Sequence, residues 1–298
     1  MKKIIALALA TLMALSLFAG CGASGSSEDA PLYTVTGKFK DTKVTTVTEG
    51  KLTIATSPDF APMEFVDPTK TGQDMYIGFD MILAHFIADE LGLELVIMPM
   101  SFDACQTAVY TGTVDIAISG FSWREDRAAN YNLSDYYVTD NEDAQILITL
   151  AANGDKFATA EALSGAKIGA QNASLQQSLV EEQLPDSVLV PIGDLGTAVL
   201  QLKAGDFDCL CVADGNADAI IASNPDLAKS GFSFYVDPKY TGNVLMLQKG
   251  NDELTEICNQ ILAESAQYWE AWDAYAETLS GIDQSYDDEG NAITEPAA

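Results

Sequence analysis

The sequence predicts a mixed α/β protein built as two lobes, and three observations support this. Apolar strand-like segments alternate with amphipathic helical segments over residues 51–118, and a second run of the same kind covers 166–212. A further strand and helix follow the second run. Alternation of this kind is typical of parallel sheets covered by helices. About 230 residues lie between a polar N-terminal segment and an acidic end, which is enough for two compact lobes.

The first run begins with a strand at Leu52–Ala55. A helix is expected next, because apolar residues recur at helical spacing at Phe79, Ile82, Leu83, Phe86 and Ile87. Gly92 is the expected C-terminal cap of that helix. A strand at Leu93–Met98, a short helix ending near Gly112 and a strand at Val114–Ile118 complete the run. This order predicts parallel strand pairing.

The second run repeats the architecture of the first. It comprises a strand at Ala166–Ala170, a helix from Ser174, a strand at Val188–Pro191, a helix at Leu195–Lys203 and a strand at Phe207–Val212. We therefore expect a second lobe over residues 146–242.

The last segment has a strand pattern at Asn243–Leu247 and a helical stripe at Leu254, Ile257, Cys258, Ile261 and Leu262. It could not bury both of its faces alone. If it returns to the first lobe, that lobe comprises 49–145 and 243–280. The chain then crosses between lobes twice, near Gln145–Thr149 and near Gly242–Val244. Two crossings predict a two-strand hinge, which suits a closing cleft.

The N-terminus has the pattern of an export signal. Lys2 and Lys3 precede an apolar run at Ile4–Phe18, about 15 residues and so short of the roughly 20 that span a bilayer. Ala19-Gly20-Cys21 follows and resembles a bacterial lipobox, which predicts a signal peptide at 1–20 and a lipid on Cys21. An ordinary secretory leader is the alternative. Residues 21–48 are expected to form a tether, with a short strand possible at Tyr33–Thr36.

The chain is strongly acidic, with a formal net charge of −29. Nucleic acid is therefore an improbable partner. Anionic lipid would also repel this surface, so membrane residence should depend on the Cys21 lipid. The acidic segment 281–298 lacks a core pattern, and we expect it to be disordered.

Four cysteines remain beyond Cys21: Cys105, Cys209, Cys211 and Cys258. Disulfides are open to an exported chain, but these residues lie in apolar segments without CxxC spacing. We favour buried free thiols.

Five short motifs, taken in order, resemble one protein family: TSPDFAPMEF at 56–65, IGFD at 77–80, MSFD at 100–103, DIAISG at 115–120 followed by Arg127, and SDYY at 134–137. They are similar to extracellular solute-binding proteins of polar amino acid ABC importers, over residues 51 to about 279. The resemblance implies a periplasmic-binding-protein-like type II fold with a two-strand hinge, closure on an amino acid, and delivery to a membrane permease. A monomer without cofactor or metal, lipid-anchored outside the cell, is expected.

The same resemblance implies a ligand site between the lobes. Arg127 would clamp the ligand carboxylate, with Ser119, Gly120 and Ser122 beside it. From the second lobe, a strand-to-helix turn would add Gln171, Ser174 and Leu175, although Ala173 stands where glycine is common. Two alternatives stay open: Arg127 could pair with Glu125 or Asp126 on the surface, and Ser174 could be only a helix cap.

Two rings and an acid complete the implied site. Phe60 and Phe102 would sandwich the ligand side chain, with a core role as the alternative. At the end of the strand 207–212, Ala213 stands where the family has an Asp for the ammonium group, so Asp214 is the candidate. Ser57 likewise replaces an Asp found in some relatives. A pocket short of carboxylates argues mildly against lysine or arginine as the ligand.

Two other function classes are weighed against binding. A few small-carboxylate dehydratases share this fold, but the single histidine, His85, lies on the flank of a helix, and no catalytic or zinc motif accompanies it. We expect no enzyme activity. A surface adhesion or sensor module would use the outer surface, about which the sequence gives no signal. Trp123 could narrow the site entrance or belong to the lobe surface.

Overall fold

The computed structural model describes residues 31–138 and 144–280. The predicted signal peptide, Cys21 and the acidic segment 281–298 lie outside these ranges. Among the described residues, no helix combines the length and the apolar character that a bilayer span requires.

Lobe 1 is built on a five-stranded sheet of order β5-β1-β6-β13-β7. Its strands are β1 (Lys51–Thr56), β5 (Glu94–Pro99), β6 (Ile116–Ala117), β7 (Tyr131–Leu133) and β13 (Met246–Gln248). β1 pairs in parallel with β5 and β6, whereas β13 is antiparallel to β6 and β7. The strand β13 comes from the far end of the chain, so the last segment does return to lobe 1.

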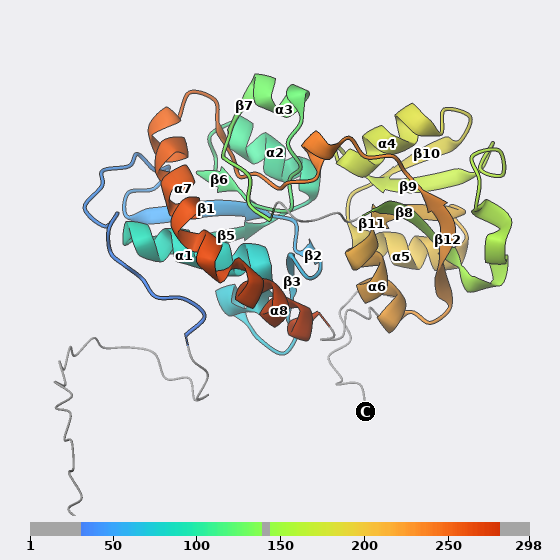
Figure 1. Cartoon of the computed structure of the whole chain (residues 1–298), viewed down its shortest axis with the longest axis horizontal. Coiled ribbons are helices and arrows are strands. Elements are labelled where there is room, and N and C mark those ends of the chain that lie inside the picture. Colours follow the sequence, from blue (N-terminus) through green and yellow to red (C-terminus); the bar gives the residue numbers. More distant parts are fainter. Residues whose placement is uncertain (1–30, 139–143, 281–298) are drawn as a thin grey trace, which may run out of the picture. The chain divides into compact units, whose positions relative to one another are not determined.

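Helices cover both faces of this sheet: α1 (Phe79–Leu91), α2 (Phe102–Tyr110), α3 (Glu125–Asn130), α7 (Asp252–Ser265) and α8 (Trp269–Leu279). Neighbouring strand residues face opposite sides. Ile54 packs in the cluster under α1, α7 and α8, while Ala55 packs in the cluster under α2. Figure 1 shows α7 and α8 beside α1, although about 160 residues separate α1 from α7. A small sheet of β2 (Asp59–Phe60), β3 (Glu64–Val66) and β4 (Tyr76–Ile77) adjoins α1.

Lobe 2 is built on a second five-stranded sheet, of order β10-β9-β11-β8-β12. Its strands are β8 (Gln145–Leu150), β9 (Lys167–Gln171), β10 (Val188–Ile192), β11 (Cys209–Ala213) and β12 (Leu227–Ser233). The helices packed on it are α4 (Leu175–Gln183), α5 (Leu195–Ala204) and α6 (Asp214–Ser223). β9 is parallel to β10 and β11, as predicted, and β8 is antiparallel to β11 and β12.

The chain passes between the two sheets twice. The first passage runs from β7 to β8. It was expected near Gln145–Thr149, but these residues form strand β8 of lobe 2, so the passage comes earlier in the chain. The second runs from β12 to β13 and includes Gly242–Val244. Asn243 forms isolated bridges to Ser122 and Tyr137 and thereby ties this passage to lobe 1. The predicted α/β fold with two lobes is confirmed.

Local sequence signals explain where several helices begin and end. Gly92 has a left-handed conformation (φ 67°) and its N–H bonds to Ala88 and Asp89, so the predicted cap of α1 is confirmed. Asp194 caps α5 by accepting a hydrogen bond from the Thr197 N–H. The C-terminal end of α1 and the N-terminal end of α5 are therefore each capped by a residue type that favours this position.

The segment 32–48 does not behave as the tether expected for it. Tyr33–Thr36 forms no strand, but the Thr36 N–H donates to Glu90 Oε1 at 2.5 Å. Phe39 is only 3% exposed within the lobe 1 core, and the Trp272 indole donates to the Leu32 carbonyl at 2.9 Å. These residues therefore belong to lobe 1 and not to a tether. The sequence pattern does not reveal this, because the contacting residues are isolated from one another along the chain.

The four cysteines of the described ranges are buried and free: Cys105, Cys209, Cys211 and Cys258. The interpretation as core thiols is confirmed. Burial raises the pKa of each thiol, which leaves all four protonated at neutral pH.

Candidate functional site

A small cavity lies between the two lobes. Residues from both lobes line it: Phe60, Glu64, Phe102, Ser119, Gly120, Ser122, Arg127, Gln171, Leu175 and Gln176. Eight of these ten are residues that the sequence predicted for the site. Glu64 and Gln176 were not among those predicted, whereas Ser174 and Asp214 do not line the cavity.

Arg127 of α3 carries the positive charge of the site. Its side chain is 2% exposed, with Nη1 donating to the Ser122 carbonyl at 2.6 Å and Nη2 to the Ala173 carbonyl at 2.9 Å. The guanidinium also lies 5.6 Å from the Phe102 ring and 5.2 Å from the Phe121 ring. The two carbonyls come from different lobes, so Arg127 spans the cleft.

Among the residues that the structure describes, no carboxylate pairs with the Arg127 charge. Glu125 pairs with Lys239, and Asp126 pairs with Arg124. Within residues 31–138 and 144–280, no carboxylate lies at ion-pair distance from Arg127, so the surface-pair alternative is wrong. Burial lowers the Arg127 pKa to about 9, which still leaves it charged at neutral pH. A buried cation of this kind favours an anion beside it.

The turn between β9 and α4 supplies the second lobe's part of the site. Ser174 Oγ accepts from the Gln177 N–H and so caps α4, which matches the structural alternative left open for Ser174. Ala173 adopts φ +60°, a left-handed conformation that disfavours residues with a Cβ. The turn thus keeps the geometry that glycine would give, and it directs the Ala173 carbonyl to Arg127.

The two predicted rings both line the cavity. Phe102 is 8% exposed and packs on Phe121 at 4.5 Å between ring centroids. Phe60 is closely approached by Gly120, since a Cβ added at Gly120 would lie 3.3 Å from the Phe60 ring. Gly120 also has φ +55°, so two independent constraints favour glycine there. Phe102 is therefore both a core residue and a wall of the site.

Glu64 of β3 gives the site a carboxyl that was not among the predicted site residues. Its Oε1 accepts from the Ser119 hydroxyl at 2.6 Å, and Oε2 has no hydrogen-bond partner among the described residues. Behind it, Asp80 accepts from the Gly120 N–H and the Tyr137 hydroxyl. Burial and the Asp80 charge raise the Glu64 pKa well above its ordinary value. The many acids of this chain concealed the signal.

Asp214 does not reach the cavity. Its carboxylate pairs with Lys229 at 2.8 Å, on a partly exposed part of lobe 2. The strand end that faces the site is Ala213, which lines an adjoining hollow of about 50 Å³ that shares Phe60 and Gln176 with the first cavity. The prediction that Asp214 replaces the missing acid is therefore wrong, because one residue further along the chain the side chain starts α6 and points elsewhere.

Gln171 and Gln176 bring neutral amides from lobe 2. The Gln171 amide nitrogen donates to Asp59 Oδ2 at 3.1 Å, and Gln176 donates to the Gln145 amide oxygen at 2.7 Å. Asp59 itself is buried beside the cavity and accepts also from Ser57 and from the Leu195 N–H. Both amides thus have one interaction that orients them.

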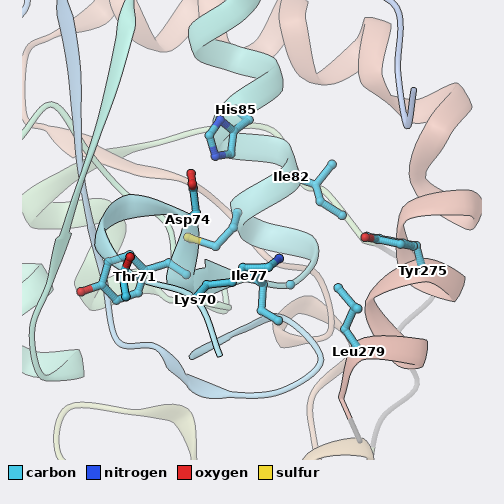
Figure 2. A pocket seen from close by; sticks show the side chains of 11 residues that line it. Lys70, Thr71, Asp74, Ile77, Ile82, His85, Tyr275 and Leu279 are labelled. Atoms are coloured by element: carbon cyan, nitrogen blue, oxygen red, sulfur yellow. The ribbon is translucent and has the colours of Figure 1, made fainter. Parts of the chain in front are cut away.

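A larger hollow of about 570 Å³ lies on lobe 1 alone, between α1, β4 and α8 (Figure 2). His85 stands at its rim with Lys70 and Asp74, and all three are exposed. Among the described residues, no buried charge lines this hollow and no Ser-His-Asp arrangement surrounds His85. Trp123 lies partly buried against the core under α2 and does not line the interlobe cavity. The buried ionisable groups Arg127 and Glu64 line the interlobe cavity and not this hollow.

The chain is similar to known solute-binding proteins. The family model described as bacterial extracellular solute-binding proteins, family 3, matches residues 52–271. The arginine-binding extracellular protein ArtP of Bacillus subtilis is 28% identical over 270 residues, covering 89% of this chain and 92% of ArtP. A probable histidine-binding protein of Campylobacter jejuni is 29% identical over 212 residues, covering 68% of this chain and 78% of the relative.

Solved structures give the same result. The amino acid ABC transporter substrate-binding protein AbpA of Streptococcus pneumoniae, bound to L-arginine, superimposes with a TM-score of 0.70 and 30% identity. The match covers 78% of this chain and 96% of AbpA.

Proposed function

Because the chain belongs to the bacterial extracellular solute-binding proteins of family 3, we propose that it captures an α-amino acid between its lobes and delivers it to the permease of an ABC importer. The observation that carries this proposal is the buried Arg127 charge, which lacks a carboxylate partner among the described residues. An amino acid always brings a carboxylate. The planar guanidinium can bind both of its oxygens at once.

The solute we propose is a polar amino acid, with arginine, histidine and glutamine as first candidates. Glu64 supplies a carboxyl at the cavity, so the expectation of a pocket short of carboxylates no longer argues against a cationic side chain. The amides of Gln171 and Gln176 add neutral donors and acceptors. Phe60 and Phe102 supply flat walls for an extended side chain. The arginine and histidine relatives support this range of solutes.

Entry of the solute requires the lobes to separate. The cavity measures about 30 Å³, room for a few water molecules at most and not for an amino acid. Ligand contacts to both lobes then favour closure, since only the closed state makes them all. The closed form would present its combined lobe surfaces to the permease.

The location we propose follows from the family and the N-terminal pattern. The family is extracellular, and the sequence at 1–21 resembles a leader with a lipidated Cys21. We propose a monomer, tethered by this lipid on the outer side of the cell membrane. Mass spectrometry of the mature N-terminus tests the lipid directly.

The test of the binding function is a thermal-shift screen of solute-stripped protein against the twenty amino acids. A solute at about 100 times its dissociation constant adds roughly 2.7 kcal/mol to the free energy of unfolding. We expect shifts with one or a few polar amino acids. No shift with any of them would contradict the proposal.

A further inference from the structure

Asp59 makes a buried polar contact between the lobes that solute binding does not require. It lies in β2 of lobe 1 and is 8% exposed. Its Oδ2 accepts from the Leu195 N–H at 2.8 Å and from the Gln171 amide nitrogen at 3.1 Å. Both donors belong to lobe 2, and Leu195 is the first residue of α5, where N–H groups lack helical partners. Asp59 therefore binds lobe 2 only while the lobes are closed.

The contacts of Asp59 suit a protonated carboxyl as well as an ionised one. Oδ2 can accept both N–H groups as a carbonyl oxygen. Oδ1 lies 3.0 Å from the Ser57 hydroxyl, so this hydrogen bond can run toward Ser57 when Oδ1 carries the proton. The protonated form thus satisfies every contact without burying a charge.

We infer that Asp59 is a positioning residue that holds the two lobes closed, and that closure takes up one proton at its carboxyl. This inference rests on the proposed function, because it assigns a role in solute capture. It goes further in making the open and closed populations depend on pH even without solute.

Burial and acidic neighbours favour the proton on Asp59, and they outweigh the donors Leu195 N–H, Ser57 and Gln171, which lower its pKa. Asp194 of α5 and Glu64 of β3 are acidic neighbours, and Cys105 of α2 is a buried thiol whose own pKa is raised partly by Asp59. Burial, followed by the Asp194 charge, raises the Asp59 pKa from 3.8 to about 7. In the open state the carboxyl is in water and titrates near its ordinary value of about 4.

The sign of the pH dependence follows from these pKa values. Between about pH 4 and pH 7 the closed state binds more protons than the open state, so closure is favoured as the pH falls. One proton gives at most about a tenfold change in the closed-to-open ratio for each pH unit in this window. Above it, the closed state carries the full cost of a buried carboxylate.

The first measurement uses solute-free full-length protein and small-angle X-ray scattering between about pH 5 and pH 8. We expect the wild type to become more compact as the pH falls. Asp59→Ala removes the acceptor, leaves two N–H groups unpaired in the closed state, and should stay open at every pH. Asp59→Asn can accept both N–H groups and donate to Ser57, so it should stay closed across the whole range.

Release of bound amino acid gives the second measurement, by stopped-flow fluorescence at about pH 6. Asp59→Ala should release the solute about 10- to 100-fold faster than the wild type, while Asp59→Asn should remain within about threefold of it. If Asp59 had only a structural role, Asp59→Asn and the wild type would show the same dependence of compaction on pH in the scattering experiment.

The matched control is Asp115→Asn. Asp115 is a buried carboxyl that accepts from the Thr53 and Val47 N–H groups at 2.8 and 2.6 Å, entirely within lobe 1. Its variant should keep the wild-type pH response. Equal compaction of the wild type and Asp59→Ala, or a wild-type pH slope in Asp59→Asn, overturns the inference. Because scattering needs no solute, a failure of amino acid binding would leave this test valid.

Discussion

The two sides of the interlobe cavity differ in charge. The lobe 1 side carries the guanidinium of Arg127 and the carboxyl of Glu64, both buried. The lobe 2 side carries Gln171, Leu175 and Gln176, none of which is charged. Lobe 1 therefore offers partners for both ends of a zwitterion before closure. Lobe 2 adds neutral contacts and removes water when it closes.

This difference predicts that the two sides of the cavity contribute unequally to the affinity for the solute. Charged contacts in a dry site are strong, whereas neutral hydrogen bonds contribute about 1 kcal/mol each. Substitutions in lobe 1 should therefore affect binding more than substitutions in lobe 2. Four predictions, in order of decreasing effect, test this difference between the lobes.

Arg127→Ala should weaken amino acid binding at least about 100-fold, because the ligand carboxylate loses its buried charged partner. Isothermal titration calorimetry measures the change, and circular dichroism checks that the fold persists. Arg127→Lys is the control, since it keeps the charge but not the planar fork. Its affinity should lie between those of the wild type and Arg127→Ala. Micromolar binding by Arg127→Ala would contradict the carboxylate assignment.

Glu64→Gln should change selectivity. We expect arginine to lose about tenfold in affinity relative to glutamine. A cationic side chain beside Glu64 favours loss of the Glu64 proton and gains from the resulting carboxylate, which Gln cannot form. Competition between the two amino acids measures this ratio in a single experiment. If both lose affinity equally, Glu64 acts through the position of Ser119 and not through its charge.

Gln176→Ala, on the neutral side, should weaken binding about fivefold, the effect of one uncharged hydrogen bond of about 1 kcal/mol. Gln183→Ala provides the control on the same helix, because the Gln183 amide bonds to the Tyr235 backbone away from the cavity. Calorimetry on both variants distinguishes the two positions. A loss as large as that of Arg127→Ala would remove the asymmetry between the lobes.

Ala173→Gly should have the smallest effect, raising the free energy of unfolding by about 0.5 kcal/mol. Glycine relieves the strain of the left-handed conformation at φ +60°. It also raises the conformational entropy of the unfolded chain, which opposes folding and offsets part of the gain. Ala170→Gly, in the buried strand β9, should have the opposite sign. Urea unfolding of both variants measures the two signs, and a destabilised Ala173→Gly would indicate that the turn is not strained.

Most of the fold was predictable because its signals are local. The helical stripe from Phe79 to Ile87, the Gly92 cap and the strand at Val188 each depend on a few neighbouring residues. Strand alternation also has a local origin, and it places Ile54 and Ala55 on opposite faces of one sheet.

Parts of the site were not predictable, because they depend on distant residues. Asp214 turns away from the cavity toward Lys229, which is 15 residues further along the chain. Glu64 becomes a site residue only because β3 folds beside Ser119, 55 residues later. Arg127 and the rings were found through a family resemblance, and periodicity alone gives no reason to choose them.

The N-terminal segment that packs on lobe 1 has a mechanical consequence. Leu32 and Phe39 are anchored on α8 and on the lobe 1 core, so any pull along the chain from the N-terminal side is borne by lobe 1. If Cys21 holds the protein to a membrane, lobe 1 is the stationary body and lobe 2 the swinging arm. The lobe whose side of the cavity is charged would then be the attached one, and the lobe whose side of the cavity is neutral would be the one that moves.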